Sequence, residues 1–157
     1  MRRQHGLSLI ELIIFIVIVS VGLVGILSVL NVTVRHSADP MVRKQALAIA
    51  EAMMEEVLAK DFANPDGGFS GAATNANRGS FDDIWDYNGF TMSGGIYSIG
   101  DTSTPVSGLD GYGVGVEVDF TALGGITLAS QQAARIAVTV TGSGETLTLN
   151  GYRTNYQ

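Results

Sequence analysis

A peptide bond between Gly6 and Leu7 and a carboxylate at Glu11 are the groups near the N-terminus that could act chemically. Cleavage of this bond would leave a new α-amine on Leu7, four residues before Glu11. This spacing is one helical turn, so the amine and the carboxylate could neutralise each other within one subunit or between neighbours. Pairing between neighbours would set the axial register of a bundle of packed helices.

A second group of carboxylates lies in the segment 81–90, FDDIWDYNGF. Asp82, Asp83 and Asp86, together with Asn88, offer the oxygen ligands that Ca²⁺ takes, but their spacing does not match the twelve-residue EF-hand loop. Asp and Asn also cap turns, and turn capping is the favoured interpretation. The aromatic residues of the segment anchor it on the domain or form a subunit contact. We therefore predict no metal site and keep the three aspartates as a subordinate calcium candidate.

The rest of the chain shows no pattern for a nucleophile, a metal or a phosphate. His5 and His36 precede the globular part, which excludes a His-dependent triad or zinc site within it. The Gly-rich run 111–115 lies inside an alternating strand and precedes no helix, which argues against a nucleotide loop. We expect no enzyme activity and no cofactor.

Charge and cysteine content restrict the partners further. Removal of residues 1–6 takes away two of the 9 basic residues and leaves 7 against 15 acidic ones, a net charge of about −8. An acidic chain lacks the basic patch of a nucleic-acid surface. Because there is no cysteine, an exported domain that could otherwise form disulfides must rely on packing or on neighbouring subunits.

An apolar segment follows the charged N-terminus. Residues 12–30 carry no charge over 19 positions and would span roughly 28 Å as a helix, close to the thickness of a bilayer core. Arg2 and Arg3 place the N-terminal side in the cytoplasm. A retained anchor is favoured over a removed signal because no clear small-residue cut site follows the segment, Ser37-Ala38-Asp39 being a faint candidate.

Three residues in or beside this span are not typical hydrocarbon-facing side chains. Glu11 either finds a partner, since a carboxylate at the bilayer centre costs about 2.5–3.5 kcal/mol, or lies at the depth of the lipid headgroups. Gly22 and Gly25 either permit close helix contact or local unwinding, or reflect the general frequency of Gly in membrane helices.

Residues 41–60 show helical periodicity, which predicts an amphipathic helix packed on a folded domain. Asp39 and Pro40 interrupt the pattern, so one bent helix and two helices with Asp39 as an N-cap both fit. The predicted packed face consists of Leu47, Ala50, Met54, Val57 and Leu58, and the opposite face of Lys44, Ala48, Glu51, Glu55 and Ala59.

Beyond this helix, residues 61–110 are rich in Gly, Asn, Ser and Asp and predict loops, with short strands near 95–99. Residues 112–120 alternate and predict a strand with Tyr112, Val114, Val116, Val118 and Phe120 on one face. Alternation returns at Ile136, Val138 and Val140 and, after the turn 142–145, at Leu147 and Leu149. Three antiparallel strands can cover the amphipathic helix.

The run Gly6 to Glu11, GLSLIE, resembles the prepilin signature of type IV pilins and type II secretion pseudopilins. The resemblance implies that Gly6 ends a leader, that Leu7 becomes the N-methylated first residue and that Glu11 is the fifth mature residue. Leu7 departs from the common Phe or Met at that position. The segments 81–90, 111–120 and 136–157 also resemble minor pilins of the mannose-sensitive haemagglutinin (MSHA) pilus system.

These resemblances imply a type IV pilin-like α+β fold with one bent helix packed on a small C-terminal antiparallel sheet. The expected regions are a leader at 1–6, a transmembrane helix at 7–34, an amphipathic continuation at 35–60, a loop-rich region at 61–110 and the sheet at 111–157. The expected function is a minor pilin whose partners are the prepilin peptidase, other pilin subunits, the inner-membrane assembly platform and, before assembly, membrane lipid. The chain would cross the inner membrane once with its C-terminal domain periplasmic and later reach the pilus or cell surface.

Two alternatives remain open at this stage. A type II secretion pseudopilin shares the leader but serves protein export. A signal-anchored periplasmic enzyme or ligand-binding domain would not need Glu11 for assembly.

Overall fold

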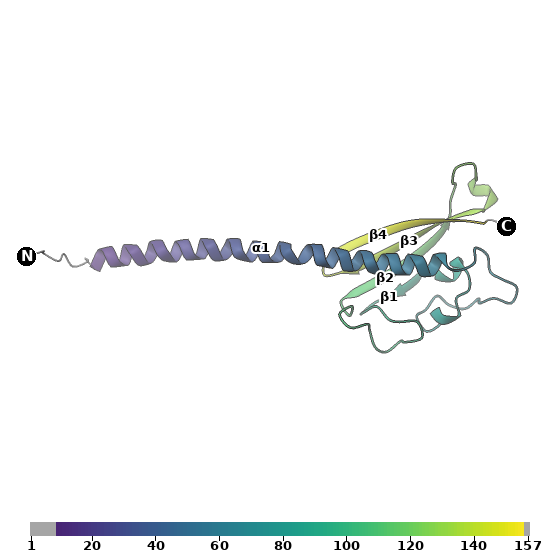
Figure 1. The fold of residues 1–157 in the computed structure, drawn as a ribbon, viewed down its shortest axis with the longest axis horizontal. Coiled ribbons are helices and arrows are strands. Elements are labelled where there is room, and N and C mark those ends of the chain that lie inside the picture. The colour runs from purple at the N-terminus through teal and green to yellow at the C-terminus, as the bar shows by residue number, and fades with distance from the viewer. Residues whose placement is uncertain (1–8, 156–157) are drawn as a thin grey trace, which may run out of the picture. The chain divides into compact units, whose positions relative to one another are not determined.

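The computed structural model describes the backbone of residues 9–155 and the side chains of residues 9–28 and 40–155. It divides into two compact units, Met1–Met41 and Val42–Gln157. The predicted cleavage and methylation sites, Gly6 and Leu7, lie outside the described residues. One long helix, α1 (Leu9–Leu58), begins in the first unit and ends in the second, and four strands follow it (Figure 1).

The described part of the first unit is helical and apolar. The stretch Leu9–Ser28 has a mean hydropathy of 2.9, none of it is buried, and it is long and apolar enough to cross a membrane. Pro40 lies inside α1, so the single-helix alternative is correct and the alternative with Asp39 as an N-cap is wrong. Proline removes one intrahelical backbone hydrogen bond, and the helix continues on both sides of that missing bond.

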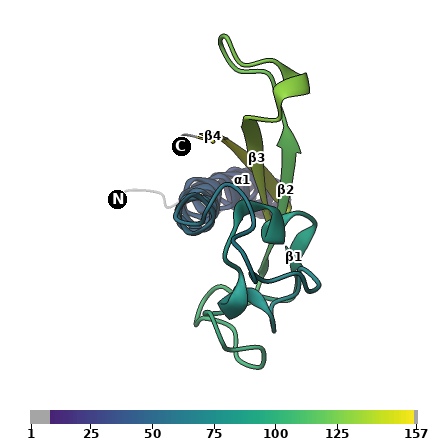
Figure 2. The same ribbon diagram turned by 90° about the vertical axis from the view of Figure 1, so that its right-hand side faces the viewer.

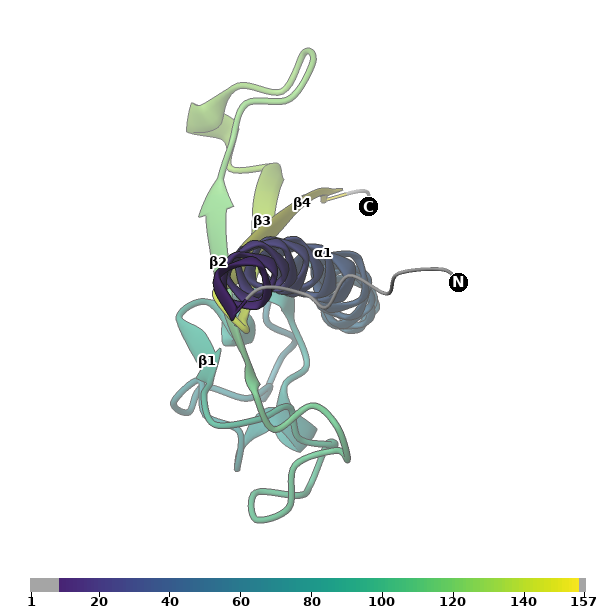
Figure 3. The same ribbon diagram turned by 90° about the vertical axis from the view of Figure 1, so that its left-hand side faces the viewer.

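The second unit contains a four-stranded antiparallel sheet in the order β1-β2-β3-β4. Its strands are β1 (Phe90–Met92), β2 (Tyr112–Phe120), β3 (Ala133–Gly142) and β4 (Glu145–Thr154). Figures 2 and 3 show β1 and β4 at opposite edges of the sheet. The predicted strand 112–120 is confirmed as β2, and the two predicted C-terminal strands are confirmed as β3 and β4.

Local sequence explains the sheet. Tyr112, Val114, Val116 and Val118 point one way and are buried, as the alternation in β2 predicts. Phe120 is 36% exposed and lies at the end of this row, with its ring centroid 4.2 Å from that of Trp85. The β3–β4 turn consists of Ser143 and Gly144 at positive φ, 49° and 85°, which is the two-residue turn that matches strand twist.

The prediction of short strands near 95–99 is wrong, and the fourth strand lies earlier, at β1. Gly94 and Gly95 have φ of 74° and 134°, which takes the chain out of strand geometry. Ile96 then donates its N–H to the carbonyl of Leu109 and accepts from the N–H of Val106. These bonds close a loop instead of continuing the sheet.

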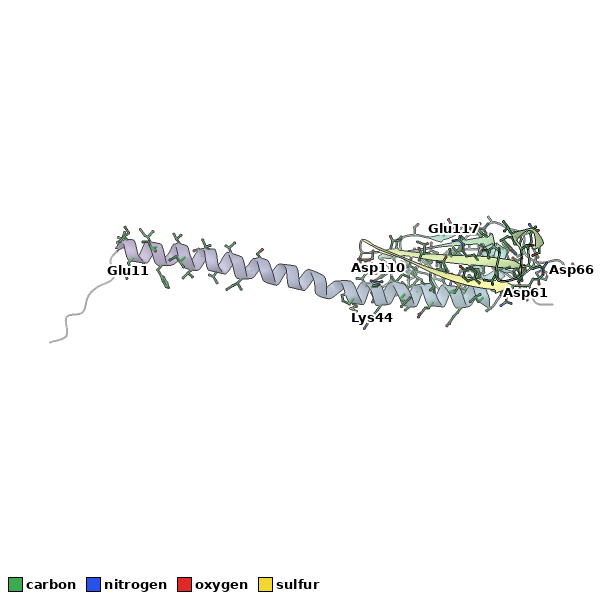
Figure 4. The ribbon with its side chains drawn as sticks, turned by 90° about the horizontal axis from the view of Figure 1, so that it is seen from above. Glu11, Lys44, Asp61, Asp66, Asp110 and Glu117 are labelled. Carbon is green, nitrogen blue, oxygen red and sulfur yellow. The ribbon has the colours of Figure 1, made fainter. Side chains whose placement is uncertain are left out.

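The packed face of α1 is rotated slightly from the predicted face. Ala50, Met54 and Val57 are buried as predicted, but Leu47 is 38% exposed and Leu58 is half-buried. Ala46 and Ala50, 2% and 0% exposed, contribute small side chains to the buried face. The buried residues of α1 are Ala46, Ile49, Ala50, Met53, Met54 and Val57. Lys44 on the opposite face is exposed and points away from the sheet (Figure 4).

The last strand of the second unit contacts the C-terminal end of α1. The last turn of the helix contains no basic residue. Arg153 near the end of β4 donates from Nη1 to the carbonyl oxygen of Leu58 at 2.7 Å. A cation at this position satisfies a terminal carbonyl and interacts favourably with the helix dipole.

Candidate functional site

Glu11 lies in the first turn of α1, at the N-terminal end of the apolar stretch (Figure 4). It is the only charged residue between Leu9 and Ser28, and its side chain is exposed. The polar side chain of Ser20 is satisfied locally, because its hydroxyl donates to the carbonyl of Ile16 at 2.7 Å. Glu11 is thus the residue of this stretch whose charge calls for a partner in an apolar environment.

Gly22 and Gly25 have open space around them. A Cβ atom added at either position would meet no atom within 4 Å. The fold of the single chain therefore does not require glycine at these positions. Close contact with another helix, local unwinding and general membrane-helix composition all remain predictions.

The carboxylates of Asp82, Asp83 and Asp86 come together, with one oxygen of each within 4.8 Å of the others. They surround the start of a short 3₁₀ turn, η2 (Ile84–Tyr87). Asp83 Oδ1 accepts from the N–H groups of Trp85 at 2.6 Å and Asp86 at 3.2 Å. Asp86 Oδ2 in turn accepts from the N–H groups of Asp82 at 2.9 Å and Asp83 at 3.3 Å. This reciprocal pattern is a capping box.

The third carboxylate ties this turn to the preceding loop. Asp82 Oδ2 accepts from the N–H of Phe69 at 2.8 Å, while its other oxygen is buried with no partner among the described residues. Asp83 is 1% exposed, and burial raises the pKa of its carboxyl, with the neighbouring charges of Asp86 and Asp82 adding to the rise. The hydrogen bonds agree with the favoured turn-capping interpretation. Calcium binding stays a subordinate prediction.

A buried ion pair joins α1 to the loop-rich region. Arg78, 7% exposed, donates from Nε to Glu56 Oε1 at 2.7 Å, and its Nη2 forms a second bond to Glu56 Oε2. Its Nη1 donates to the carbonyl of Tyr97 at 2.8 Å. The hydroxyl of Tyr87 donates to Glu56 Oε1 at 2.8 Å. Burial, followed by this bond to Glu56, raises the pKa of the Tyr87 hydroxyl.

Sequence reasoning missed this ion pair, although one signal was present. Arg78 is the only basic residue between positions 61 and 110, in a segment that contains seven aspartates. A lone cation in an acidic loop region is a good candidate for a buried partner. The sequence could not identify its partner Glu56, because the same helix also contains Glu51 and Glu55. The structure shows that these two glutamates are exposed.

A shallow apolar groove of about 280 Å³ lies beside this ion pair. Glu56 and Arg78 contribute its charged part. The apolar lining comes from one flank of α1 and from the loop that packs on it, and consists of Ala48, Ile49, Ala52, Met53, Ile96 and Leu109. The groove offers packing surface and a neutralised ion pair.

Comparison with known proteins bears on the N-terminus. The family model for the prokaryotic N-terminal methylation motif matches residues 1–27. No curated protein and no solved structure matches the chain. The match includes the Gly6–Leu7 bond, Glu11 and most of the apolar stretch, while the segments 81–90, 111–120 and 136–157 lie outside it.

This match supports a type IV pilin-like chain, of the pilin or pseudopilin class, that is processed by prepilin peptidase and assembles with other pilins. The long apolar helix followed by a four-stranded antiparallel sheet has the α+β architecture expected for that class. Together they support membrane anchoring and a structural subunit.

Proposed function

We propose that this chain is a minor pilin of an MSHA-like type IV pilus, most similar in its exported domain to the minor pilin D of that system. Prepilin peptidase cuts between Gly6 and Leu7, and the new amine of Leu7 is methylated. The subunit then enters or primes the filament. The observation that carries the proposal is the methylation motif at residues 1–27, which includes most of the 20-residue apolar stretch Leu9–Ser28.

Before assembly, lipid surrounds the apolar stretch and the N-terminus faces the cytoplasm, because Arg2 and Arg3 precede the span. The second unit lies in the periplasm. During assembly at the inner-membrane platform, the apolar stretch leaves lipid and packs against the same stretch of other subunits. Van der Waals contact replaces contact with lipid, so helix packing alone provides little choice of axial register.

Glu11 provides that register. In an apolar filament core its carboxylate carries an energetic penalty of the order of 2.5–3.5 kcal/mol unless it meets a cation. The α-amine of a neighbour's Leu7 is the cation that cleavage creates. A neighbour shifted by a helical turn, about 5.4 Å, would leave both charges unpaired, which is strongly unfavourable.

The sheet domain is the exposed part of the subunit. It has no disulfide to hold its loops, and the Arg78–Glu56 pair performs that task by fixing the region 61–110 to α1. The segments 81–90, 111–120 and 136–157 support the MSHA-like assignment, because they carry the resemblance to minor pilins of that system.

A type II secretion pseudopilin is the second candidate, since the same methylation motif serves both classes. Labelling of intact cells separates the two. A minor pilin appears in long surface fibres, whereas a pseudopilin stays in short periplasmic structures.

The direct test is the intact mass of the protein purified from its own membranes. We expect a chain that begins at Leu7 and carries one added methyl group. A Gly6→Val variant should keep residues 1–6, because the peptidase requires the small residue before the cut. A mature chain that starts elsewhere would refute the proposed site.

Assembly is tested separately with Glu11→Ala. This variant should be cleaved as usual and reach the membrane, yet its amount in sheared filaments should fall at least tenfold. Glu117→Ala, which removes an exposed carboxylate from β2, is the matched control and should enter filaments normally. Equal incorporation of both variants would contradict the role of Glu11.

A further inference from the structure

The two edges of the sheet are very different. β1 contributes three residues to one edge, whereas β4 contributes ten to the other. The register of β3 with β4 is continuous from Gly142↔Glu145 to Ala133↔Thr154, without a bulge. Among the described residues no further strand pairs with β4. The molecule therefore has one long, regular open edge.

The hydrogen-bond pattern determines which groups of β4 are free. In an antiparallel pair, alternate residues bond to the partner strand and the residues between them point their N–H and C=O groups outward. The tight two-residue turn makes Glu145 and Gly142 a bonded pair, and the bond from Asn155 N–H to the Gln132 carbonyl shows the same phase at the other end. The outward groups thus belong to Thr146, Thr148, Asn150, Tyr152 and Thr154.

The middle of this edge lacks the usual protection against pairing. Natural edge strands are blunted by charged side chains, especially lysine, by proline, by bulges, by short length or by inward-pointing charges. Between Thr146 and Tyr152 the strand has none of these and no charged residue. The charged Arg153 turns inward to the end of α1. An unprotected edge of this length favours the addition of another strand.

An apolar ledge lies beneath the same edge. Leu147 and Leu149 face the helix side of the sheet and are only half-buried. Leu47 lies two helical turns before Met54, on the flank of α1 that packs on Gly151 of β4, and it is 38% exposed. The helical periodicity of the sequence includes Leu47 in the packed face, yet the sheet of this chain ends before it reaches that side chain.

We propose that the open edge of β4 receives an extended strand from a different subunit of the filament, which adds a fifth strand to the sheet. The free N–H and C=O groups determine the chemistry of the occupant, since only another extended backbone can satisfy them in series. A lipid or a helix would cover the leucines but would leave these groups unpaired. The inference rests on the proposed function for the identity of the partner.

The ledge specifies the side chains of the incoming strand. Successive side chains of a strand point to opposite faces, so apolar residues at alternate positions would cover Leu47, Leu147 and Leu149. The residues between them would lie beside Thr146, Thr148 and Asn150 on the polar face. The partner strand is thus alternately apolar and polar, and free of proline.

Proline substitutions test the edge without breaking the existing ladder. Thr148→Pro and Asn150→Pro each remove an N–H that points away from β3, and proline is tolerated on such positions. Thr148→Val and Asn150→Thr keep the N–H and are the matched controls. Thr148→Val also accounts for loss of the hydroxyl contact to Thr139 at 3.0 Å.

We expect both proline variants to reach the membrane in normal amount and to fall at least tenfold in sheared filaments, while both controls incorporate normally. Folding is checked by the unfolding transition of the full-length protein in detergent. Folded proline variants that enter filaments within twofold of their controls would overturn the inference alone. If the wild-type chain does not enter filaments, the proposed function fails and the inference fails with it.

A second measurement needs no proline and settles the question if the variants do not fold. Amide hydrogen exchange of wild-type protein should be fast at Thr146, Thr148 and Asn150 in detergent and at least tenfold slower in filaments. Unchanged exchange at these amides in filaments would overturn the inference. A Thr148→Cys chain, otherwise free of cysteine, tests for a second copy. A disulfide-linked dimer of this chain in filaments would also overturn it.

Discussion

Replacement of Arg78 by alanine tests how the loop-rich region is held to α1. The side chain of Arg78 is 8% exposed and that of Glu56 is 15% exposed, so both charges are largely removed from water. Arg78→Ala removes two bonds to Glu56 and the bond to the carbonyl of Tyr97. Glu56 then keeps only the hydroxyl of Tyr87 among the partners described above.

The expected loss of unfolding free energy is about 3–5 kcal/mol, the usual cost of leaving a buried charge without its partner. The residual bond from Tyr87 favours the lower end of this range. A domain of this size has a total stability of roughly 5–15 kcal/mol, so the variant should remain folded but lose a large part of its margin. With a urea dependence of about 1–3 kcal/mol per molar, the midpoint should fall by at least 1 M.

Trp85 provides the assay, because it is the only tryptophan and lies within the sheet domain. Its indole N–H donates to the carbonyl of Phe62 at 2.8 Å, so its fluorescence reports local packing during urea unfolding in mild detergent. Arg135→Ala is the control, since the Arg135–Asp119 pair has a similar separation, 3.0 Å, but side chains that are 41% and 60% exposed. This exposed pair should contribute no more than about 1 kcal/mol. Equal losses for the two arginine variants would refute the reasoning.

Two further predictions concern packing and pH. Gly151→Ala would place a Cβ 2.5 Å from the sulfur of Met54, so the unfolding free energy should fall by about 1–3 kcal/mol. Gly111→Ala, whose Cβ would meet no atom within 4 Å, is the control in the same urea-unfolding measurement. Equal stability of the two variants would contradict the close approach of Gly151 to Met54. Because folding raises the pKa of Asp83 above its ordinary value of 3.8, protonation of this carboxyl contributes stability below pH 3.8, and this contribution is lost as the pH rises through the folded pKa. Asp83→Asn keeps the capping oxygen but has no group that titrates. Its stability relative to wild type should therefore increase as the pH rises, which urea unfolding at several pH values measures. A difference that does not change with pH would contradict the raised pKa of Asp83.

Much of the sheet could be predicted because short-range patterns determine it. Strand β2 has buried residues at every second position, and a Ser-Gly turn of the required geometry separates β3 from β4. The helix could be predicted from its apolar stretch and its later periodicity. The choice between the alternatives at Pro40 needed the structure, since one missing hydrogen bond is compatible with either a continuous or a broken helix.

The features that could not be predicted depend on distant contacts. The exposure of Leu47 depends on how far the sheet extends across α1, and helical periodicity contains no information about that width. The position of β1 depends on pairing with Val114 and Val116, more than twenty residues away. The partner of Arg78 is a residue from another element, chosen by tertiary packing. Cleavage at Gly6 and pairing by Glu11 remain predictions, supported by the motif at the N-terminus.

The bond from Arg153 to the Leu58 carbonyl also has a consequence for the order of folding. These residues are 95 positions apart, so the chain between them makes up most of the second unit. Contacts of such long sequence separation form late, because the entropy of closing the intervening chain must be lost first. A chain synthesised from its N-terminus has α1 complete long before its terminal carbonyl can find this cation. Docking of β4 on the helix is therefore the step that finishes the domain, and truncation before residue 153 should leave a domain whose helix end frays.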